Sequence, residues 1–237
     1  MKIVYRKSFY KSVELACFIT GDFFYFMNFD KVILMIARLL ALALAFPFHE
    51  SAHGLAALML GDKSAKDAGR ITMNPFKHFD LLGFALLMLV GFGWGKPVPV
   101  NAYNFKYKKS GIALTALAGP VSNLLLAYIS IIVFKLVYIF LPSLQFLQLF
   151  LYYSIFINIS LMIFNLIPVP PLDGSRILYY FMDDESYFNY SRYSTILFIV
   201  LLIVIEVLDR TGIYASIIKS IFNVLDEGSL FVEKLFA

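Results

Sequence analysis

Residues 32–60 form a mostly apolar stretch that exceeds the roughly 20 residues a helix needs to cross a lipid bilayer. Its second half contains His49-Glu50-Ser51-Ala52-His53. On a helix, positions i and i+4 lie on one face, so both imidazoles can hold one metal ion. Glu50 can reach a metal-bound water and act as its general base. Ionisable residues inside a membrane are costly, so the pattern indicates hydrolysis within the bilayer, the alternative being a polar patch at a helix interface.

Composition narrows the class of protein. Of the 237 residues, 60% are hydrophobic and 15% are charged, whereas a soluble domain has about 25% charged residues. The chain is therefore predicted to be an integral protein of the cell membrane. Its net charge of +4 and the absence of a long basic run fit basic cytoplasmic loops and exclude nucleic acid as the expected partner. The one cysteine, Cys17, excludes an intramolecular disulfide framework.

We predict an all-α polytopic membrane protein with about six hydrophobic segments. They are residues 32–60, 79–94, 112–141, 144–167, 194–208 and 213–225. The segment 79–94 is short and has lysines on both flanks, which favours a re-entrant or half-spanning element. Residues 69–75 are predicted to form a short strand that ends in a turn. At membrane depth such a strand must be buried in protein or line a cavity.

The chain is predicted to divide into an N-terminal interfacial segment, residues 1–30, and a single membrane-embedded domain, residues 31–237. The basic start of the first segment is not followed by a small-residue cleavage site typical of a signal peptide. We expect residues 5–20 either to lie on the membrane surface as an amphipathic helix or to form a weakly structured tail.

Two residues interrupt the apolar pattern. Pro47 precedes the first histidine by two positions and is expected either to kink the helix or to mark the start of a separate one. Lys135 stands within the third hydrophobic segment, where it is expected either to extend toward the interface or to face the bundle interior.

A catalytic zinc site usually has three protein ligands and a water, so the two histidines require a third ligand. Asp173 is the favoured candidate because it follows a proline-rich break that presents its carboxylate toward a cavity. The alternative is that Asp173 only caps the next helix. His78 is the other candidate ligand.

Several pieces of the sequence form a combined pattern between about residues 49 and 178. They are His49-Glu50-Ser51-Ala52-His53, Gly61-Asp62, residues 69–75 with His78, residues 96–100, residues 118–123 and residues 165–174. In this order they resemble the site-2 protease family of intramembrane zinc metalloproteases, in its compact form without appended domains.

The resemblance implies that His49, His53 and Asp173 bind Zn²⁺ and that Glu50 is the catalytic base. Asn165 matches an asparagine near the active site that can donate a hydrogen bond to the developing oxyanion or to substrate. The alternative role for Asn165 is a helix-packing hydrogen bond.

Other polar residues of the pattern have less definite roles. Gly119, Pro120 and Asn123 are interpreted as mainly architectural, because small residues allow helices to approach closely. His78 and Asp80 are expected to form a membrane-interface turn, to support the metal ligands or to touch substrate.

The predicted function is that of an intramembrane zinc metalloendopeptidase, a multi-pass protein in which Glu50 assists attack of a metal-activated water. The expected partners are the lipid bilayer and a membrane-protein substrate with a transmembrane segment. Substrate choice would rest on the membrane core or on a separate regulatory protein. The rivals are a scaffold or metal transporter, which has no need of Glu50, and a zinc hydrolase that acts on a substrate other than peptides.

Overall fold

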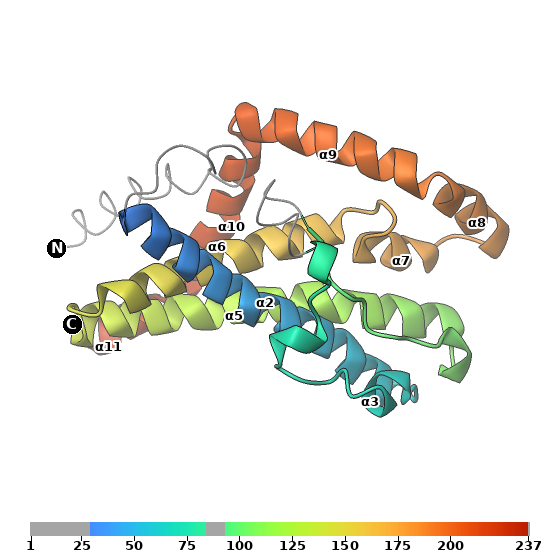
Figure 1. The fold of residues 1–237 in the computed structure, drawn as a ribbon, viewed down its shortest axis with the longest axis horizontal. Coiled ribbons are helices and arrows are strands. Elements are labelled where there is room, and N and C mark those ends of the chain that lie inside the picture. Colours follow the sequence, from blue (N-terminus) through green and yellow to red (C-terminus); the bar gives the residue numbers. More distant parts are fainter. Residues whose placement is uncertain (1–28, 84–92, 237) are drawn as a thin grey trace.

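The computed structural model describes residues 29–83 and 93–236. Three long helices form its centre. They are α2 (Phe29–Met59), α5 (Lys108–Phe140) and α6 (Gln145–Leu166). All three pack against one another, and α5 and α6 run along the long axis while α2 crosses them obliquely (Figure 1). The shared core contains small residues of α2, such as Ala37 and Ala41, against larger residues of α5 and α6, such as Ile131 and Ile159.

The buried face of α2 repeats every four residues. Its members are Ala37, Ala41, Ala45, His49, His53 and Ala57, all less than 9% exposed. Residues four apart lie nearly above one another on a helix, so this stripe forms one ridge that faces the bundle. Because alanine side chains are small, α5 and α6 can approach α2 closely along this ridge. The two histidines thus lie on the face that packs against the other two helices.

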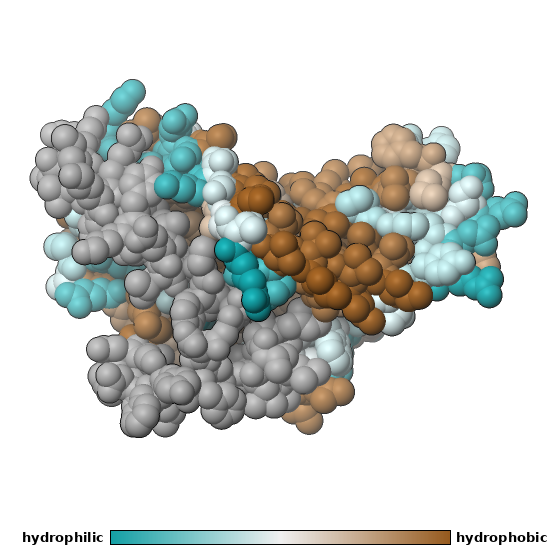
Figure 2. All heavy atoms as spheres, turned by 90° about the horizontal axis from the view of Figure 1, so that it is seen from above, coloured by the Kyte–Doolittle hydropathy of each residue, from teal (hydrophilic) through white to brown (hydrophobic). Residues whose placement is uncertain are grey.

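The remaining helices connect or surround the central three. They are α3 (Ser64–Asp67), α7 (Asp173–Tyr179), α8 (Asp184–Arg192), α9 (Ser194–Arg210), α10 (Ile213–Gly228) and α11 (Leu230–Leu235), with short 3₁₀ turns at Pro75–Lys77 and Ala102–Asn104. α9 lies along the upper edge of the molecule (Figure 1). Its outward side exposes apolar residues such as Ile196, Ile199 and Ile203, and a broad hydrophobic band covers this face (Figure 2). Such a surface suits hydrocarbon better than water.

The prediction of about six hydrophobic segments is confirmed only in part. In the described part of the chain, α2, α5 and α6 are long and apolar enough to cross a membrane. A fourth span is added if α8 and α9, which meet at a bend of 63°, count as one broken span. The segments 194–208 and 213–225 are helical, but α9 and α10 have only 17 and 16 residues. Most of the predicted element 79–94 and nearly all of the N-terminal segment lie outside the described residues.

The predicted strand at residues 69–75 is not formed, and no strand occurs among the described residues. The backbone here bends, because side chains satisfy its polar groups in place of a neighbouring strand. Ser51 Oγ donates to the Thr72 carbonyl at 2.7 Å and accepts from the Thr72 N–H at 3.2 Å. His78 Nε2 also contacts the Thr72 carbonyl at 2.9 Å. Asn74 then caps the 3₁₀ turn at Pro75.

The two residues that interrupt the apolar pattern have definite positions. Pro47 is fully buried within α2, which continues through it as a single helix and does not start a separate one. Lys135 faces the bundle interior and is 2% exposed. Its Nζ lies 2.8 Å from Asp226 Oδ1 of α10 and 3.2 Å from Glu233 Oε1 of α11. This ion-pair cluster therefore attaches the C-terminal helices to α5.

We predict that Lys135→Met lowers the free energy of unfolding by about 2 kcal/mol or more, because it leaves two carboxylates near the core without their cation. Thermal unfolding in detergent measures the change. The matched control is Arg210→Met, whose partner Glu206 lies 2.9 Å away on the exposed side of α9. An exposed pair of this kind contributes about 0.5 kcal/mol or less. Equal losses in the two variants would contradict the structural role given to Lys135.

Candidate metal centre and active site

Three side-chain atoms converge on the buried face of α2. The Nε2 atoms of His49 and His53 lie 2.9 Å apart. Asp173 Oδ2 is 3.2 Å from the first and 3.1 Å from the second. Ligands about 2.0–2.2 Å from a tetrahedral zinc ion lie roughly 3.3 Å from one another, so the spacing fits zinc. All three residues are less than 9% exposed.

The other nitrogen of each imidazole has an acceptor. His53 Nδ1 donates to the Thr115 carbonyl at 2.7 Å, and His49 Nδ1 is 2.5 Å from Asn123 Oδ1. A proton on Nδ1 leaves a lone pair on Nε2, which is the form that binds a metal. Two lone pairs and a carboxylate oxygen at this spacing repel one another unless a cation lies among them. The donor set is therefore chemically suited to Zn²⁺.

Asp173 is brought to the histidines by the break between α6 and α7. It is the first residue of α7 and follows Leu172, which has an extended backbone. A Cβ atom on Gly174 would lie 2.4 Å from the carbonyl oxygens of Leu166 and Ile167, so glycine allows α7 to start directly against the end of α6. This start places Asp173 Oδ2 against the Nε2 atoms of both histidines.

Glu50 lies beside the three converging atoms but faces a different partner. Its Oε2 accepts a hydrogen bond from the Val98 N–H at 3.1 Å. The carboxylate is close to the imidazoles. One ligand atom each of His49, Glu50 and His53 lies within 4.8 Å of the other two. Because the backbone of Val98 holds one oxygen, the second remains available as a proton acceptor.

The site opens into a polar cavity of about 130 Å³. Its lining consists of His49, Glu50, His53, Pro97, Val98, Val100, Asn165, Pro171, Leu172, Asp173 and Arg176. Asn165 Nδ2 donates to the Leu161 carbonyl of its own helix at 3.0 Å. Asn165 therefore lines the cavity, while its hydrogen bond to Leu161 is within α6 and not across helices.

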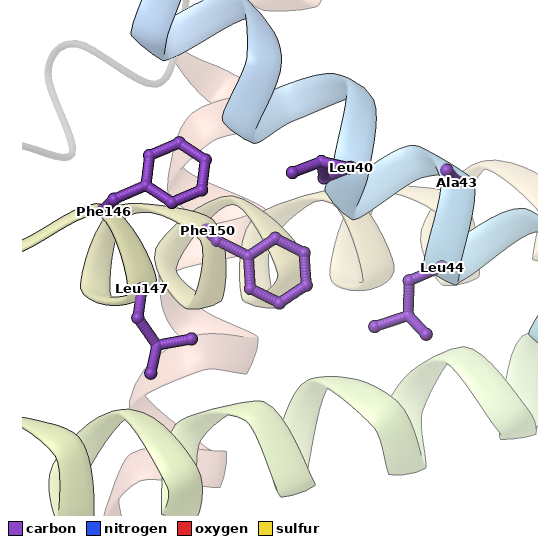
Figure 3. Close-up of a pocket in the computed structure, with 6 residues that line it drawn as sticks. All are labelled: Leu40, Ala43, Leu44, Phe146, Leu147 and Phe150. Atoms are coloured by element: carbon purple, nitrogen blue, oxygen red, sulfur yellow. The ribbon is translucent and has the colours of Figure 1, made fainter. Parts of the chain in front are cut away.

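A larger hollow of about 400 Å³ lies elsewhere between α2 and α6 (Figure 3). Leu40, Ala43 and Leu44 line it from α2, and Phe146, Leu147 and Phe150 from α6. None of these residues can be ionised or bind a metal, so the chemistry belongs to the smaller polar cavity.

The second candidate ligand, His78, is not brought to the cluster. Its side chain is fully buried against the bend at Thr72, and its backbone carbonyl accepts from the Lys96 N–H at 2.7 Å. Asp80 Oδ1 accepts from the Gly83 N–H at 3.0 Å. Both residues thus make local contacts in the connection that follows α3.

Gly119 and Asn123, interpreted from the sequence as mainly architectural, touch the site. Asn123 holds His49, and Gly119 lies against both imidazoles. A Cβ atom at Gly119 would lie 2.4 Å from His53 Nε2 and 2.5 Å from His49 Cε1. The sequence does contain a sign of this contact. The buried residues of α2 repeat every four positions, and a helix that packs closely against them needs small residues.

Asp62 positions the segment that faces Glu50. Its carboxylate accepts from Ser64 N–H and Oγ at 3.0 and 2.6 Å, from Asn101 N–H at 2.7 Å and from Asn104 Nδ2 at 2.7 Å. These bonds anchor the chain three residues after Val98. Burial would raise the pKa of the Asp62 carboxyl, but the hydrogen bonds, first that of Ser64, lower it.

Comparisons with known proteins identify a family and several relatives. Residues 141–206, which include Asn165 and Asp173, match peptidase family M50. "Putative zinc metalloprotease YwhC" of Bacillus subtilis is 41% identical over 152 residues, which cover 61% of this chain and 68% of the relative. "Putative zinc metalloprotease MJ0611" of Methanocaldococcus jannaschii is 30% identical over 180 residues, which cover 74% of this chain and 86% of the relative. "Putative zinc metalloprotease Rip2" of Mycolicibacterium smegmatis is 27% identical over 150 residues, which cover 58% of this chain and 54% of the relative.

No solved structure matches the chain. The family match and the relatives define a zinc metalloprotease, and its apolar helices suit a membrane. The chain belongs to peptidase family M50, the site-2 protease family predicted from its motifs.

We predict that Gly119→Ala lowers zinc affinity by about tenfold or more, because the added methyl group displaces both imidazoles. Zinc content after dialysis against a competing chelator measures the effect. Gly228→Ala is the control, since its Cβ atom would meet only the Tyr128 ring, at 3.7 Å. Full zinc content in Gly119→Ala would contradict the close approach of α5 to the histidines.

We predict that Asp62→Asn destabilises the protein at neutral pH and that this difference narrows in acid. A carboxyl whose pKa is lowered on folding stabilises the protein above its unfolded pKa, and the effect is lost as pH falls through the folded pKa. The gap in unfolding temperature between wild type and variant should therefore shrink below about pH 4. A gap that stays constant between pH 7 and about pH 3 would show that the charge of Asp62 contributes nothing.

Proposed function

We propose that this chain is an intramembrane zinc metalloendopeptidase that hydrolyses peptide bonds in or near transmembrane segments of other membrane proteins. The observation that carries the proposal is the convergence of His49, His53 and Asp173 to about 3 Å beside the Glu50 carboxylate. The two histidines and Glu50 lie on α2, which is long and apolar enough to span a membrane. Family membership supports the same conclusion.

His49, His53 and Asp173 would hold the zinc ion. When bound, zinc acts as a Lewis acid that lowers the pKa of a coordinated water toward neutrality. Thr115 and Asn123 fix the rotation of the two imidazoles, so the Nε2 atoms are already aimed at one point. Such preorganisation avoids the cost of ordering the ligands when the metal arrives.

Glu50 would act as the general base and then as the general acid. Its carboxylate takes a proton from the attacking water and returns it to the nitrogen of the departing peptide fragment. The Val98 N–H holds one carboxylate oxygen in place, which keeps the other directed at the reacting water. A structural zinc site has no need of such a base.

Asn165 would stabilise the negative oxygen that forms on the substrate carbonyl. One N–H of its amide is used by the Leu161 carbonyl, and the amide has a second N–H that can face the cavity that Asn165 lines. A preorganised donor of this kind contributes about 3 kcal/mol to lowering the barrier.

The substrate must be extended at the bond that is cut, because helical carbonyls are already hydrogen-bonded. The bend at residues 71–73 is a poor place for an added strand, since side chains already occupy both polar groups of Thr72. The segment Pro97 to Val100 lines the cavity instead and offers the better surface for an unwound substrate.

The proposed setting is the cell membrane, crossed several times by the chain. Lys106, Lys108 and Lys109 stand at or just before the start of α5, within about three turns of the residues that touch the site. Basic residues at helix ends favour the cytoplasmic side, so the site would open toward the cytoplasm. A separate regulatory protein remains a proposed partner.

The test separates metal binding from catalysis. Wild-type protein purified in detergent should contain about one zinc per chain. His49→Ala and Asp173→Ala should lose it. Glu50→Gln should keep its zinc and cleave a fluorescent single-span peptide in proteoliposomes about 100-fold more slowly or worse. The control, Glu206→Gln on the exposed side of α9, should cleave as wild type does.

Two results would contradict the proposal. Cleavage by Glu50→Gln at the wild-type rate would remove the assigned base. Zinc retained by Asp173→Ala alone would move the third ligand to another residue.

A further inference from the structure

A line of buried polar side chains leads from His49 away from the cavity and into the helix bundle. It passes through Asn123 on α5 and Asn158 on α6 and ends at Ser154 and Ser130. Asn123, Asn158 and Ser154 are 0% exposed, and Ser130 is 4% exposed. Buried amides in an apolar bundle are costly unless they are fully paired. The chemistry proposed above uses neither Asn158 nor the serines.

The contacts of this line form one continuous chain. His49 Nδ1 lies 2.5 Å from Asn123 Oδ1, and Asn123 Nδ2 donates to Asn158 Oδ1 at 2.7 Å. Asn158 Nδ2 donates to the Ser154 backbone carbonyl at 2.7 Å. Ser154 Oγ and Ser130 Oγ lie 3.0 Å apart, beyond this carbonyl.

The Ser154 backbone carbonyl determines the direction of each bond between Ser154 and His49. A carbonyl oxygen can only accept, so Asn158 must turn its NH₂ group toward Ser154 and its oxygen toward Asn123. Asn123 must then donate to Asn158 and present its own oxygen to His49. An oxygen acceptor at this position requires a proton on His49 Nδ1, which leaves the lone pair on Nε2.

We propose that Asn158, which lies two hydrogen bonds from His49, is a positioning residue that selects the metal-binding tautomer of His49. The inference rests on the proposed role of His49 as a metal ligand. Through Asn123, the Ser154 carbonyl prevents the alternative arrangement, in which a flipped Asn123 amide donates to Nδ1 and the proton moves to Nε2. In that arrangement His49 could not bind the metal through Nε2.

A simple helix-packing role for Asn158 makes a different prediction. Asparagines that only join helices stabilise the bundle whichever way their amides point. Their loss would lower stability without changing the tautomer of His49. The positioning role requires the direction of the bonds, so a replacement that keeps the direction should keep the function.

Two substitutions at residue 158 test this difference. Asn158→Leu removes the acceptor for Asn123 and frees that amide to flip. Asn158→Asp keeps the direction, because a carboxyl buried here is neutral and can donate its O–H to the Ser154 carbonyl while its other oxygen accepts from Asn123. Ser130→Ala is the control, since Ser130 contacts only the hydroxyl of Ser154 in this chain of bonds.

The first readout is the histidine tautomer in zinc-free protein, at a pH at which the ¹⁵N shifts themselves show neutral rings. The chain has only 3 histidines, so ¹⁵N-histidine NMR can assign each ring with His53→Gln and His78→Gln. We expect the Nδ1–H form of His49 in wild type, Asn158→Asp and Ser130→Ala, and the Nε2–H form in Asn158→Leu. The second readout is zinc affinity by chelator competition, with a loss of about 10- to 100-fold expected only in Asn158→Leu.

An Nε2–H tautomer in wild type would overturn the inference, even if the protein proves to be an active protease. Wild-type tautomer and zinc affinity in Asn158→Leu would overturn it as well, as would equal loss in Asn158→Leu and Asn158→Asp. The NMR readout needs no bound zinc, so failure of the proposed function in the zinc and cleavage assays is distinguishable from failure of the inference.

Discussion

The close approach of α2 to α5 is the contact on which the metal site depends. The buried stripe of α2 consists of alanines and the two histidines at intervals of four residues, so the stripe residues that flank the imidazoles have side chains no larger than a methyl group. Gly119 completes the approach from α5, because any side chain there would occupy the space of the two rings. The same approach brings the Thr115 carbonyl and Asn123 within hydrogen-bond distance of the Nδ1 atoms. Packing and ligand orientation therefore have one physical cause.

Pairing of buried polar groups is the second constraint, and it explains several contacts around the site. Hydrocarbon offers no hydrogen bonds, so a polar group within the bundle is costly unless it finds a partner in the protein. Glu50 is held by the Val98 N–H, and Lys135 is held by carboxylates of α10 and α11. Residues 71–73 bend because Ser51 and His78 satisfy the backbone of Thr72. The polar residues of this chain thus act in connected groups.

Much of the site was predictable from the sequence, because its signals are local. The spacing of His49 and His53 on one helix face, and the prolines before Asp173, predict three side chains around one point, and the structure brings these three side chains together. The strand predicted at residues 69–75 was wrong, since a β-like sequence pattern cannot reveal that a distant serine will occupy its hydrogen-bonding groups. The contacts of Asn123 and Lys135 also depend on residues 35 to 98 positions away, and no local period encodes them. The roles of the site residues remain predictions until they are tested.

The most direct test of the central claim is the zinc X-ray absorption spectrum of the purified protein. The fine structure reports the number of imidazole rings and the kind of atoms bound to the metal. Two imidazole nitrogens with additional oxygen ligands, and a changed oxygen shell in Asp173→Ala, are the predicted result. Three imidazoles would contradict it, because the third could come only from His78, which the structure places against Thr72. A spectrum without imidazole scattering would mean that the converging histidines on α2 do not bind the metal.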